Sequence, residues 1–423
     1  MKKILANLSL IVASLVFSLL LVEGTLRYAF PRYQSAAETK YDPDALGLWS
    51  PRPNRKGMQA HPDTGANHFV IHNGLATRQS REIENLESRT NIAFFGDSYT
   101  VNAGLPAPYS FTEPLDYLLN LRGEHFNVLN FGVNGYGTDQ TYLLFRNFER
   151  KKHLSHVFYV LCANDLRNIF ETDLYSLGDR GELIRNPAVK SPWWIKLISR
   201  MHTTYLVLDV RQRLIHSREG GLDRYNRLLR EKAMKRAKRA HKERFESPVA
   251  YEIQEQFLEQ EENVELARVI VIFQALLFEW KQQVEANGGA FHIVLLPTGR
   301  EELFKEIIGD DYDVISLYER FVRSDEAFTW ESIRFKNDGH WAEEGNMLAA
   351  AHLYKYLEEK IGLSPLPIES LWSRLYTYYS AFDFGWMPSK SAKLEELAPA
   401  VLSDIRNKYI SLEIAASAED AKP

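Results

Sequence analysis

Residues 91–100 read Asn91-Ile-Ala-Phe-Phe-Gly-Asp-Ser-Tyr-Thr100, a short apolar run that stops at a Gly-Asp-Ser turn. An apolar strand that ends in a glycine turn presents the next serine hydroxyl at the rim of a sheet, where hydrolytic nucleophiles on α/β folds lie. Ser98 is therefore the first candidate nucleophile. Gly-Asp-Ser arises by chance in roughly one chain in ten of this length, so the assignment depends on partner residues elsewhere.

From this run onward, short apolar strands alternate with helical patterns. The alternation predicts an α/β fold with a mostly parallel central sheet that is covered on both faces. The predicted strands are residues 91–95, 126–131, 156–162, 291–296 and 313–316. Four helices are predicted. The first begins at a capping box formed by Ser110 and Glu113. The others run from Thr138 to about Lys151, from a cap at Asn263 to Ala286, and from Ala342 to Lys360.

The interval 170–287, between the third and fourth predicted strands, is too long for a simple crossover and is predicted to be a helical insertion. Between residues 211 and 244 it carries 13 Lys/Arg against 4 Asp/Glu, an excess of nine positive charges (13 − 4). Such a segment could bind anionic headgroups, an acidic polysaccharide or a partner protein. A solvated helix face paired with the acidic stretch 252–265 is the favoured interpretation.

The composition is that of an ordinary globular protein, with 423 residues of which 45% are hydrophobic and 25% charged. A net charge of −5 and a pI near 6.2 give no general attraction for nucleic acid. The single cysteine, Cys162, excludes an intramolecular disulfide framework and a multi-thiolate metal site. Neither a cofactor nor a metal is expected.

The N-terminus carries Lys2 and Lys3 before an unbroken apolar run at residues 4–22. At about 1.5 Å per residue these nineteen residues just span a bilayer core of about 30 Å. Because no small-x-small site and no lipoprotein cysteine follows closely, an uncleaved single-pass anchor over residues 1–27 is favoured over a cleaved secretory signal. The lysines then place the chain beyond Glu23 outside the inner (cytoplasmic) membrane, in the periplasm or its equivalent, although Arg27 opposes this orientation.

Residues 28–89 are rich in Pro, Asn, Arg and Gly, which predicts a spacer followed by irregular structure at the domain edge. His61, His68 and His72 lie here. Three imidazoles could bind a metal, but surface loop histidines are favoured because no helix or strand pattern aligns them.

Residues 363–423 are predicted to form a helical extension with a disordered tail. Its aromatic residues could stack on sugar rings or pack a helix against the domain. They are Trp372, Tyr376, Tyr378, Tyr379 and Trp386.

Polar residues suited to acyl transfer follow the next two predicted strands and precede the last helix. Gly135 offers a backbone N–H and Asn164 a side-chain amide, both oxyanion donors by type. In Asn337-Asp-Gly-His-Trp341, His340 is suited to act as general base and Asp338 to hold its other ring nitrogen. Each residue alone has an ordinary explanation as a turn or a cap, but their order and placement together indicate a site around Ser98.

These four blocks resemble those of the SGNH, or GDSL-type, hydrolase superfamily over residues 90–362, apart from the insertion. The stretch Ile71-His-Asn-Gly-Leu-Ala-Thr-Arg78 is similar to one often found before the serine block in membrane-anchored bacterial members. The resemblance implies a flavodoxin-like three-layer α/β/α domain with Ser98 as nucleophile. It also implies an oxyanion hole from the Ser98 and Gly135 backbone amides and the Asn164 side chain, with His340 and Asp338 completing the triad.

The chain departs from the commonest family pattern in the position of the acid, which usually stands three residues before the histidine. That position is Asn337, whereas Asp338 stands two before. The Asp-x-His-Trp spacing resembles the polysaccharide O-acetyltransferase subset, so Asp338 is kept as the acid, with a backbone carbonyl as the other possible orienter. Tyr99 replaces the leucine usual after the serine, and its side chain need not touch the reacting carbon.

An acyl group on Ser98 can pass to water, as in an esterase, or to a sugar hydroxyl, as in an O-acyltransferase, and the triad does not distinguish them. An anchored, outward-facing domain favours acyl groups, most simply acetyl, on an envelope or exported polysaccharide, with a membrane-bound acyl-donor partner. The alternatives are a general carboxylesterase or lipase, with the apolar helix 264–286 lining an acyl pocket, and a non-catalytic scaffold of a polysaccharide export complex.

Overall fold

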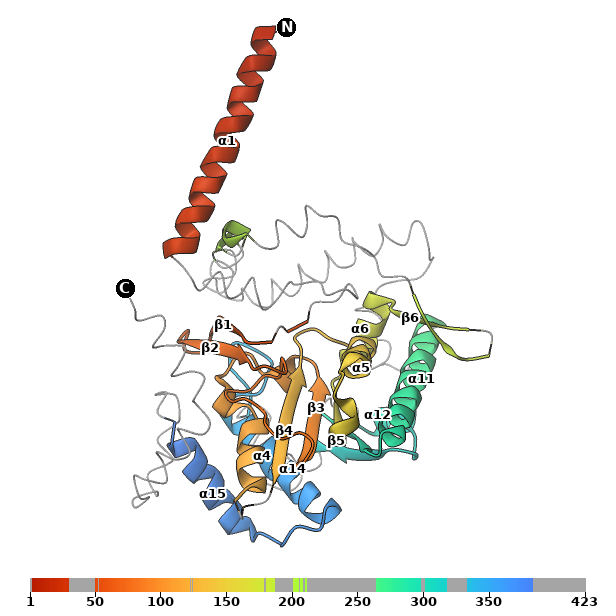
Figure 1. The fold of residues 1–423 in the computed structure, drawn as a ribbon. Helices are drawn as coiled ribbons and strands as arrows, with labels where there is room; N and C mark the ends of the chain where they lie inside the picture. The colour runs from red at the N-terminus through yellow and green to blue at the C-terminus, as the bar shows by residue number, and fades with distance from the viewer. Residues whose placement is uncertain are drawn as a thin grey trace.

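The computed structural model describes residues 2–29, 50–186 without 52, 122, 124 and 179, 201–210 without 205, 208 and 209, 264–297, 301–317 and 333–382. A sheet with helices on both sides forms the centre of this described part (Figure 1). Several predicted features lie outside the described residues. They are the basic segment 211–244, most of the acidic stretch 252–265, the expected cap Asn263, and Trp386 with the tail.

The central sheet confirms the predicted α/β architecture. Its strands are parallel and lie in the order β4-β3-β5-β8-β9. Counted along the chain this order is 2-1-3-4-5, which is the flavodoxin-like arrangement. The strands read as nearly continuous apolar runs because both faces are covered. They are β3 Thr90–Gly96, β4 Phe126–Gly132, β5 Leu154–Leu161, β8 Ala290–Leu295 and β9 Asp313–Ser316.

Alternate residues of β3 divide the core into two layers. Ile92 and Phe94 belong to a cluster with the helices on one face, and Ala93 and Phe95 to a cluster with the helices on the other (Figure 1). The first face carries α4 Thr112–Leu119, α14 Glu343–Lys360 and α15 Ile368–Ser380. The second carries α5 Thr138–Asn147, α6 Asp165–Thr172, α11 Val264–Ala286 and α12 Glu301–Ile308. The described part also contains three short helices, α3 Ser98–Val101, η1 Ala107–Tyr109 and η2 Lys151–His153.

Helix α11 has the bounds predicted for it, and its apolar side chains pack into the core. Phe273, Leu277 and Trp280 are fully buried in the cluster on that face of the sheet. The helix therefore does not use these side chains to line an acyl pocket.

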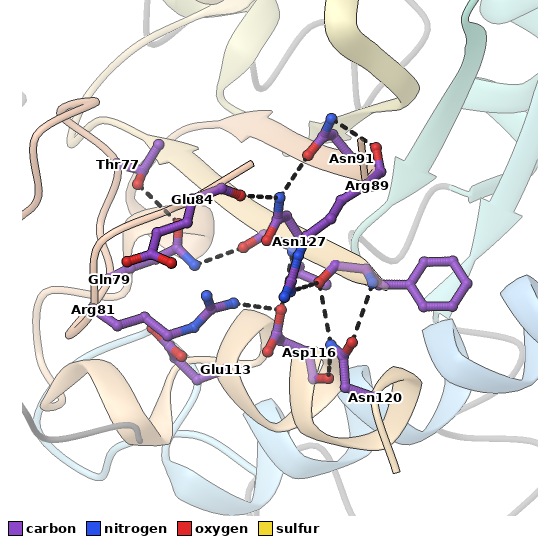
Figure 2. A network of polar contacts seen from close by, with 12 residues as sticks. Thr77, Gln79, Arg81, Glu84, Arg89, Asn91, Glu113, Asp116, Asn120 and Asn127 are labelled. Atoms are coloured by element: carbon purple, nitrogen blue, oxygen red, sulfur yellow. Dashed lines mark hydrogen bonds and ion pairs between the residues drawn. The ribbon is translucent and has the colours of Figure 1, made fainter. Parts of the chain in front are cut away.

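The outer edge of β4 is paired by residues 77–84 rather than by another strand. The backbone N–H of Arg78 donates to Asn130 O (2.8 Å), and the Gln79 amide donates to Val128 O (2.6 Å). Asp116 accepts the N–H of Val128 at 3.2 Å and binds the guanidinium of Arg81 (Figure 2). These contacts satisfy backbone groups that an exposed edge strand would leave open to other chains.

A hairpin near the N-terminal end of the domain corrects the prediction of irregular structure. Strands β1 Arg55–Ala60 and β2 Asn67–His72 pair antiparallel along their whole length. The three histidines of this region are buried, so the interpretation as surface loop histidines was wrong. His61, His68 and His72 are 4%, 7% and 5% exposed. Within the described ranges no group of three or more His, Cys, Asp or Glu could hold a metal ion.

The insertion begins differently from the helical prediction. Strands β6 Tyr175–Leu177 and β7 Leu183–Arg185 form a second antiparallel hairpin directly after α6. The two segments form strands because they pair with each other. The apolar periodicity of each segment alone does not show this pairing.

The capping box predicted at Ser110 and Glu113 was wrong. Phe111 occupies the cap position of α4, without a side-chain hydrogen bond. The Ser110 hydroxyl instead accepts from the Asn130 amide (3.2 Å), and buried Glu113 accepts the N–H of Ser80 (3.2 Å). Both polar side chains thus form hydrogen bonds with residues distant in sequence and do not cap the helix.

The described part of the C-terminal extension packs as a helix on the domain. Tyr378 and Tyr379 of α15 are 0% and 1% exposed and belong to the same core cluster as α4 and α14. Trp372 and Tyr376 pack partly buried against that cluster. Docking therefore explains these aromatic residues.

Helix α1, Lys2–Ala29, includes the stretch Ser9–Ala29, which is long and apolar enough to cross a membrane, with a mean hydropathy of 2.1. Large apolar side chains from Leu10 to Val22 are exposed, but Glu23 and Leu26 are each 7% exposed. The Glu23 carboxylate accepts the N–H groups of His202 (2.8 Å) and Thr203 (3.0 Å). The far end of α1 therefore packs on the helical turn at residues 202–204 (Figure 1).

Candidate active site

Ser98 lies at the carboxyl end of β3, where the strand order reverses between β4 and β5. In doubly wound sheets this edge is where ligands bind. A Cβ at Gly96 would lie 2.2 Å from Thr100 Oγ1 and 2.9 Å from Val160 O, so only glycine lets the chain turn here. Asp97 then caps α3 by accepting the N–H of Tyr99 at 2.9 Å. The turn and the cap together fix the Ser98 side chain at the rim.

His340 and Asp338 approach Ser98 from a loop 242 residues away in sequence. Ser98 Oγ lies 2.7 Å from His340 Nε2, and His340 Nδ1 bonds to the Asp338 carboxylate. Because a carboxylate only accepts, Nδ1 carries the proton and Nε2 is the acceptor that faces the serine hydroxyl. The structure thus brings together the three residues that the sequence suggested as a triad.

The pKa values of this pair shift apart. Burial raises the pKa of Asp338, but its hydrogen bonds to His340 and the charge of the imidazolium outweigh burial and lower it. Burial lowers the pKa of His340, but the Asp338 hydrogen bond and charge, with Asp97 adding, raise it above the ordinary histidine value. The pair therefore favours a protonated His340 ring beside an ionised Asp338 carboxylate.

A short antiparallel turn presents this pair. The N–H of Phe335 donates to His340 O at 3.0 Å, the N–H of Ala342 donates to Ile333 O at 2.9 Å, and Arg334 pairs with Trp341 as an antiparallel bridge. Asp338 and His340 thus stand at the tip of the turn, just before α14.

Asn164 reaches the same rim from the end of β5. Its amide lies 3.5 Å from Asp97 Oδ2, which is itself 3.4 Å from Ser98 Oγ. Asp165 shapes this turn by accepting the Tyr159 hydroxyl (2.6 Å) and the N–H of Cys162 (3.0 Å). Burial raises the pKa of both Asp97 and Asp165, and the charge of Asp97 adds to the rise at Asp165.

Gly135 lies on the exposed loop after β4, with a φ of +75° that favours glycine. Its N–H makes no hydrogen bond within the part of the chain that the structure describes. The end of β4 lies close to α3, because a Cβ at Gly132 would lie 2.1 Å from the backbone N of Val101. Gly135 therefore lies beyond the carboxyl end of β4, next to the strand that leads to Ser98.

Tyr99 is a site residue whose importance the sequence did not indicate. Its hydroxyl donates to Gly339 O at 2.8 Å, and its ring centroid lies 4.8 Å from that of His340 and 5.5 Å from that of Trp341. Burial raises the phenol pKa, so the hydroxyl stays a donor. Tyr99 thus connects the serine turn to the histidine loop, and its position next to Ser98 was the available signal.

The chain aligns with solved structures but with no family model or curated protein. Solved structures that align with it include a putative lipolytic protein of the G-D-S-L family from Desulfitobacterium hafniense DCB-2, at 11% identity and a TM-score of 0.33, covering 63% of this chain and 99% of that one. Axe2, an acetylxylan esterase from Geobacillus stearothermophilus, aligns at 11% identity and a TM-score of 0.33, covering 63% of this chain and 93% of that one.

Proposed function

We propose that this protein is a serine ester hydrolase or O-acyltransferase that forms an acyl-enzyme on Ser98. The observation that carries the proposal is the continuous hydrogen-bonded path from Ser98 Oγ through the His340 ring to the Asp338 carboxylate. A nucleophile bonded to a base that is oriented by a third group is the geometric signature of covalent acyl transfer.

The first half-reaction follows from the tautomer. His340 Nε2 takes the hydroxyl proton of Ser98 as Oγ attacks the ester carbonyl, and Asp338 stabilises the imidazolium that forms. His340 then returns this proton to the departing alkoxide, which leaves as an alcohol. The Ser98 ester remains.

The negative charge on the carbonyl oxygen needs donors that are in place before attack. We assign this role to the backbone N–H groups of Ser98 and Gly135 and to the Asn164 amide, which all lie at the carboxyl ends of adjacent strands. The Asn164 amide has only a long contact to Asp97 (3.5 Å) and the Gly135 N–H has no partner within the described residues, so neither gives up a strong bond to serve a ligand.

The second half-reaction decides between the two activities. Water activated by His340 would release the acid, whereas a sugar hydroxyl in the same position would receive the acyl group. We propose acetyl groups on an envelope or exported polysaccharide as the substrate. Two features support this assignment: the apolar helix α1 that precedes the domain and the Asp-x-His-Trp spacing around His340.

We propose further that α1 is retained as a single-pass anchor. A signal peptidase cut beyond Glu23 would remove this residue, whose carboxylate accepts four hydrogen bonds from His202 and Thr203. The anchor is supported by the exposed apolar side chains up to Val22 and by the buried Glu23 that follows them.

Full-length protein in detergent tests the proposal with a chromogenic acetyl ester, with and without oligosaccharide acceptors, alongside Ser98→Ala and His340→Ala. We expect turnover by the wild type and its loss in both variants, with acetylated sugar detected by mass spectrometry if transfer dominates. Absence of both turnover and acetylated sugar in the wild type contradicts catalysis. Polysaccharide modification in cells that survives Ser98→Ala would instead favour the scaffold alternative.

A further inference from the structure

The turn between β1 and β2 lies against the loop that carries Asp338 and His340. Both oxygens of the Asp63 carboxylate are used there: one accepts the N–H of Lys336 at 2.9 Å and the other the N–H of Asn337 at 2.8 Å. These two residues are exposed and immediately precede Asp338. A carboxylate that accepts two backbone N–H groups makes charge-assisted bonds, which are stronger than neutral ones.

His61 holds the other side of the same loop. Its Nδ1 accepts the N–H groups of Asp63 and Thr64, each at 3.2 Å, so its Nε2 carries the proton and donates to Glu343 Oε1 at 3.3 Å. Glu343 opens α14, three residues after His340. The His61 ring also packs edge-on against Phe335, with centroids 5.0 Å apart. The turn thus contacts the loop on both sides of the Asp338–His340 pair.

The hairpin also reaches the segment that follows Ser98. His68 Nε2 lies 3.0 Å from Ala103 O, just after α3. A Cβ at Gly104 would lie 3.0 Å from the Phe335 ring and 3.3 Å from Pro62, so the three segments pack in direct contact. The hairpin therefore bridges the two parts of the chain that must meet for Ser98 to face His340.

We propose that Asp63 is a positioning residue for His340, holding the loop at Lys336 and Asn337 so that Nε2 stays in line with the Ser98 hydroxyl. The proposal rests on the acyl-transfer function proposed for Ser98. Asp63 does not touch the reacting atoms; it acts through the backbone of the loop. Loss of this hold lets the tip of the loop move, and a displacement of about 1 Å costs up to about a hundredfold in rate.

The test compares Asp63→Ala and Asp63→Asn with Thr64→Ala in the full-length chain in detergent. Thr64 is a matched control because, among the residues that the structure describes, its hydroxyl accepts only the N–H of Ala66, inside the same turn. We expect Asp63→Ala to lower kcat between about ten- and a hundredfold with KM for the acetyl ester little changed. Asp63→Asn retains one acceptor oxygen and should lie between Asp63→Ala and the wild type, whereas Thr64→Ala should match the wild type.

Hydrogen–deuterium exchange gives a readout that does not depend on activity. The amides of Lys336 and Asn337 should exchange faster in Asp63→Ala, with protection of the β3 and β5 peptides unchanged. If Asp63→Ala fails to fold, Asp63→Asn carries the same comparison. An active wild type with unchanged kcat or unchanged loop exchange in the Asp63 variants overturns the positioning role, as does an equal loss of protection throughout the domain.

Measurements on the wild-type protein distinguish the positioning role of Asp63 from the acyl-transfer function of Ser98 on which it rests. Rapid labelling of Ser98 by a fluorophosphonate, slowed in Asp63→Ala, supports both. If the wild-type protein shows neither turnover nor labelling, both the proposed function and the positioning role of Asp63 are contradicted. If Ser98 is labelled equally fast in the wild type and in Asp63→Ala, only the positioning role of Asp63 is contradicted.

Discussion

The ring of His340 bonds through Nδ1 to the carboxylate of Asp338, and the same carboxylate oxygen accepts the backbone N–H of His340 at 2.9 Å. An acid only two residues before its histidine can thus orient the ring, because the side chain folds back over its own loop in the manner of an Asx turn. Asn337, at the position that is acidic in the commoner pattern, is exposed.

Replacement of Asp338 by Asn should lower kcat by about 10²- to 10⁴-fold, because an amide can stabilise the wrong imidazole tautomer and cannot stabilise the imidazolium. The matched change Asn337→Asp should leave kcat within about twofold. Steady-state kinetics with a chromogenic acetyl ester checks both. Equal effects of the two substitutions would show that Asp338 is not the orienting acid.

The pH profile of kcat/KM should rise with pH along an acid limb that lies above the ordinary histidine pKa of about 6.5. His340 must be neutral to accept the serine proton, and its pKa is raised in the folded protein, so activity is lost as pH falls through that raised value. In Asp338→Asn the limb should move to lower pH, because the charge of Asp338 and its hydrogen bond, which raise the pKa of His340 most, are lost. A limb that stays in place in this variant would assign the titration to another group.

Replacement of Asn164 by Ala should lower kcat by about 10²- to 10³-fold while KM changes little, because an oxyanion donor strengthens its bond only as charge develops. Its long contact to Asp97 (3.5 Å) predicts little loss of stability. A fall in Tm comparable to that of a buried-core variant, with kcat retained, would assign Asn164 to structure instead.

Replacement of Tyr99 by Phe removes the hydroxyl that donates to Gly339 O. Loss of one such bond is worth about 1 kcal/mol, so we expect kcat to fall about fivefold if the bond holds the histidine loop. Tyr109→Phe is the control, because the Tyr109 hydroxyl donates to Phe382 O at 2.8 Å in the core, away from the loop. Tyr109→Phe should lower Tm without lowering kcat, and the reverse pattern would contradict the role given to Tyr99.

Local sequence was sufficient for the strands and for the place of Ser98 just after β3, but not for the parts that depend on distant partners. The apolar runs gave the central strands to within two residues because burial on both faces demands continuous apolar side chains. Residues 55–60, Arg-Lys-Gly-Met-Gln-Ala, have no such pattern and become a strand only by pairing with β2. The contact of Asp63 with Lys336 spans 273 residues, so no local pattern could have indicated it.

Replacement of Glu113 by Gln should stabilise the protein increasingly as pH rises. Burial raises the pKa of Glu113 to about 7, with Arg81 opposing the rise and Asp116 adding to it. The folded chain therefore keeps a proton that the unfolded chain releases near pH 4.5, so the stability linked to this group is full below pH 4.5 and is lost as pH rises through 7.

Glutamine keeps an oxygen for the N–H of Ser80 and cannot ionise. The Tm difference between variant and wild type should thus grow in favour of Glu113→Gln from pH 5 to pH 8.

The Tm difference, and not the Tm of either protein, is the proper measure, because burial lowers the pKa of His68 and His292 to about 4. Those histidines make the stability of both proteins rise with pH over the range from about 4 to 6.5. Glu82→Gln, at an exposed carboxylate, is the control for the loss of one negative charge. A Tm difference that is constant with pH would mean that Glu113 titrates at its ordinary value.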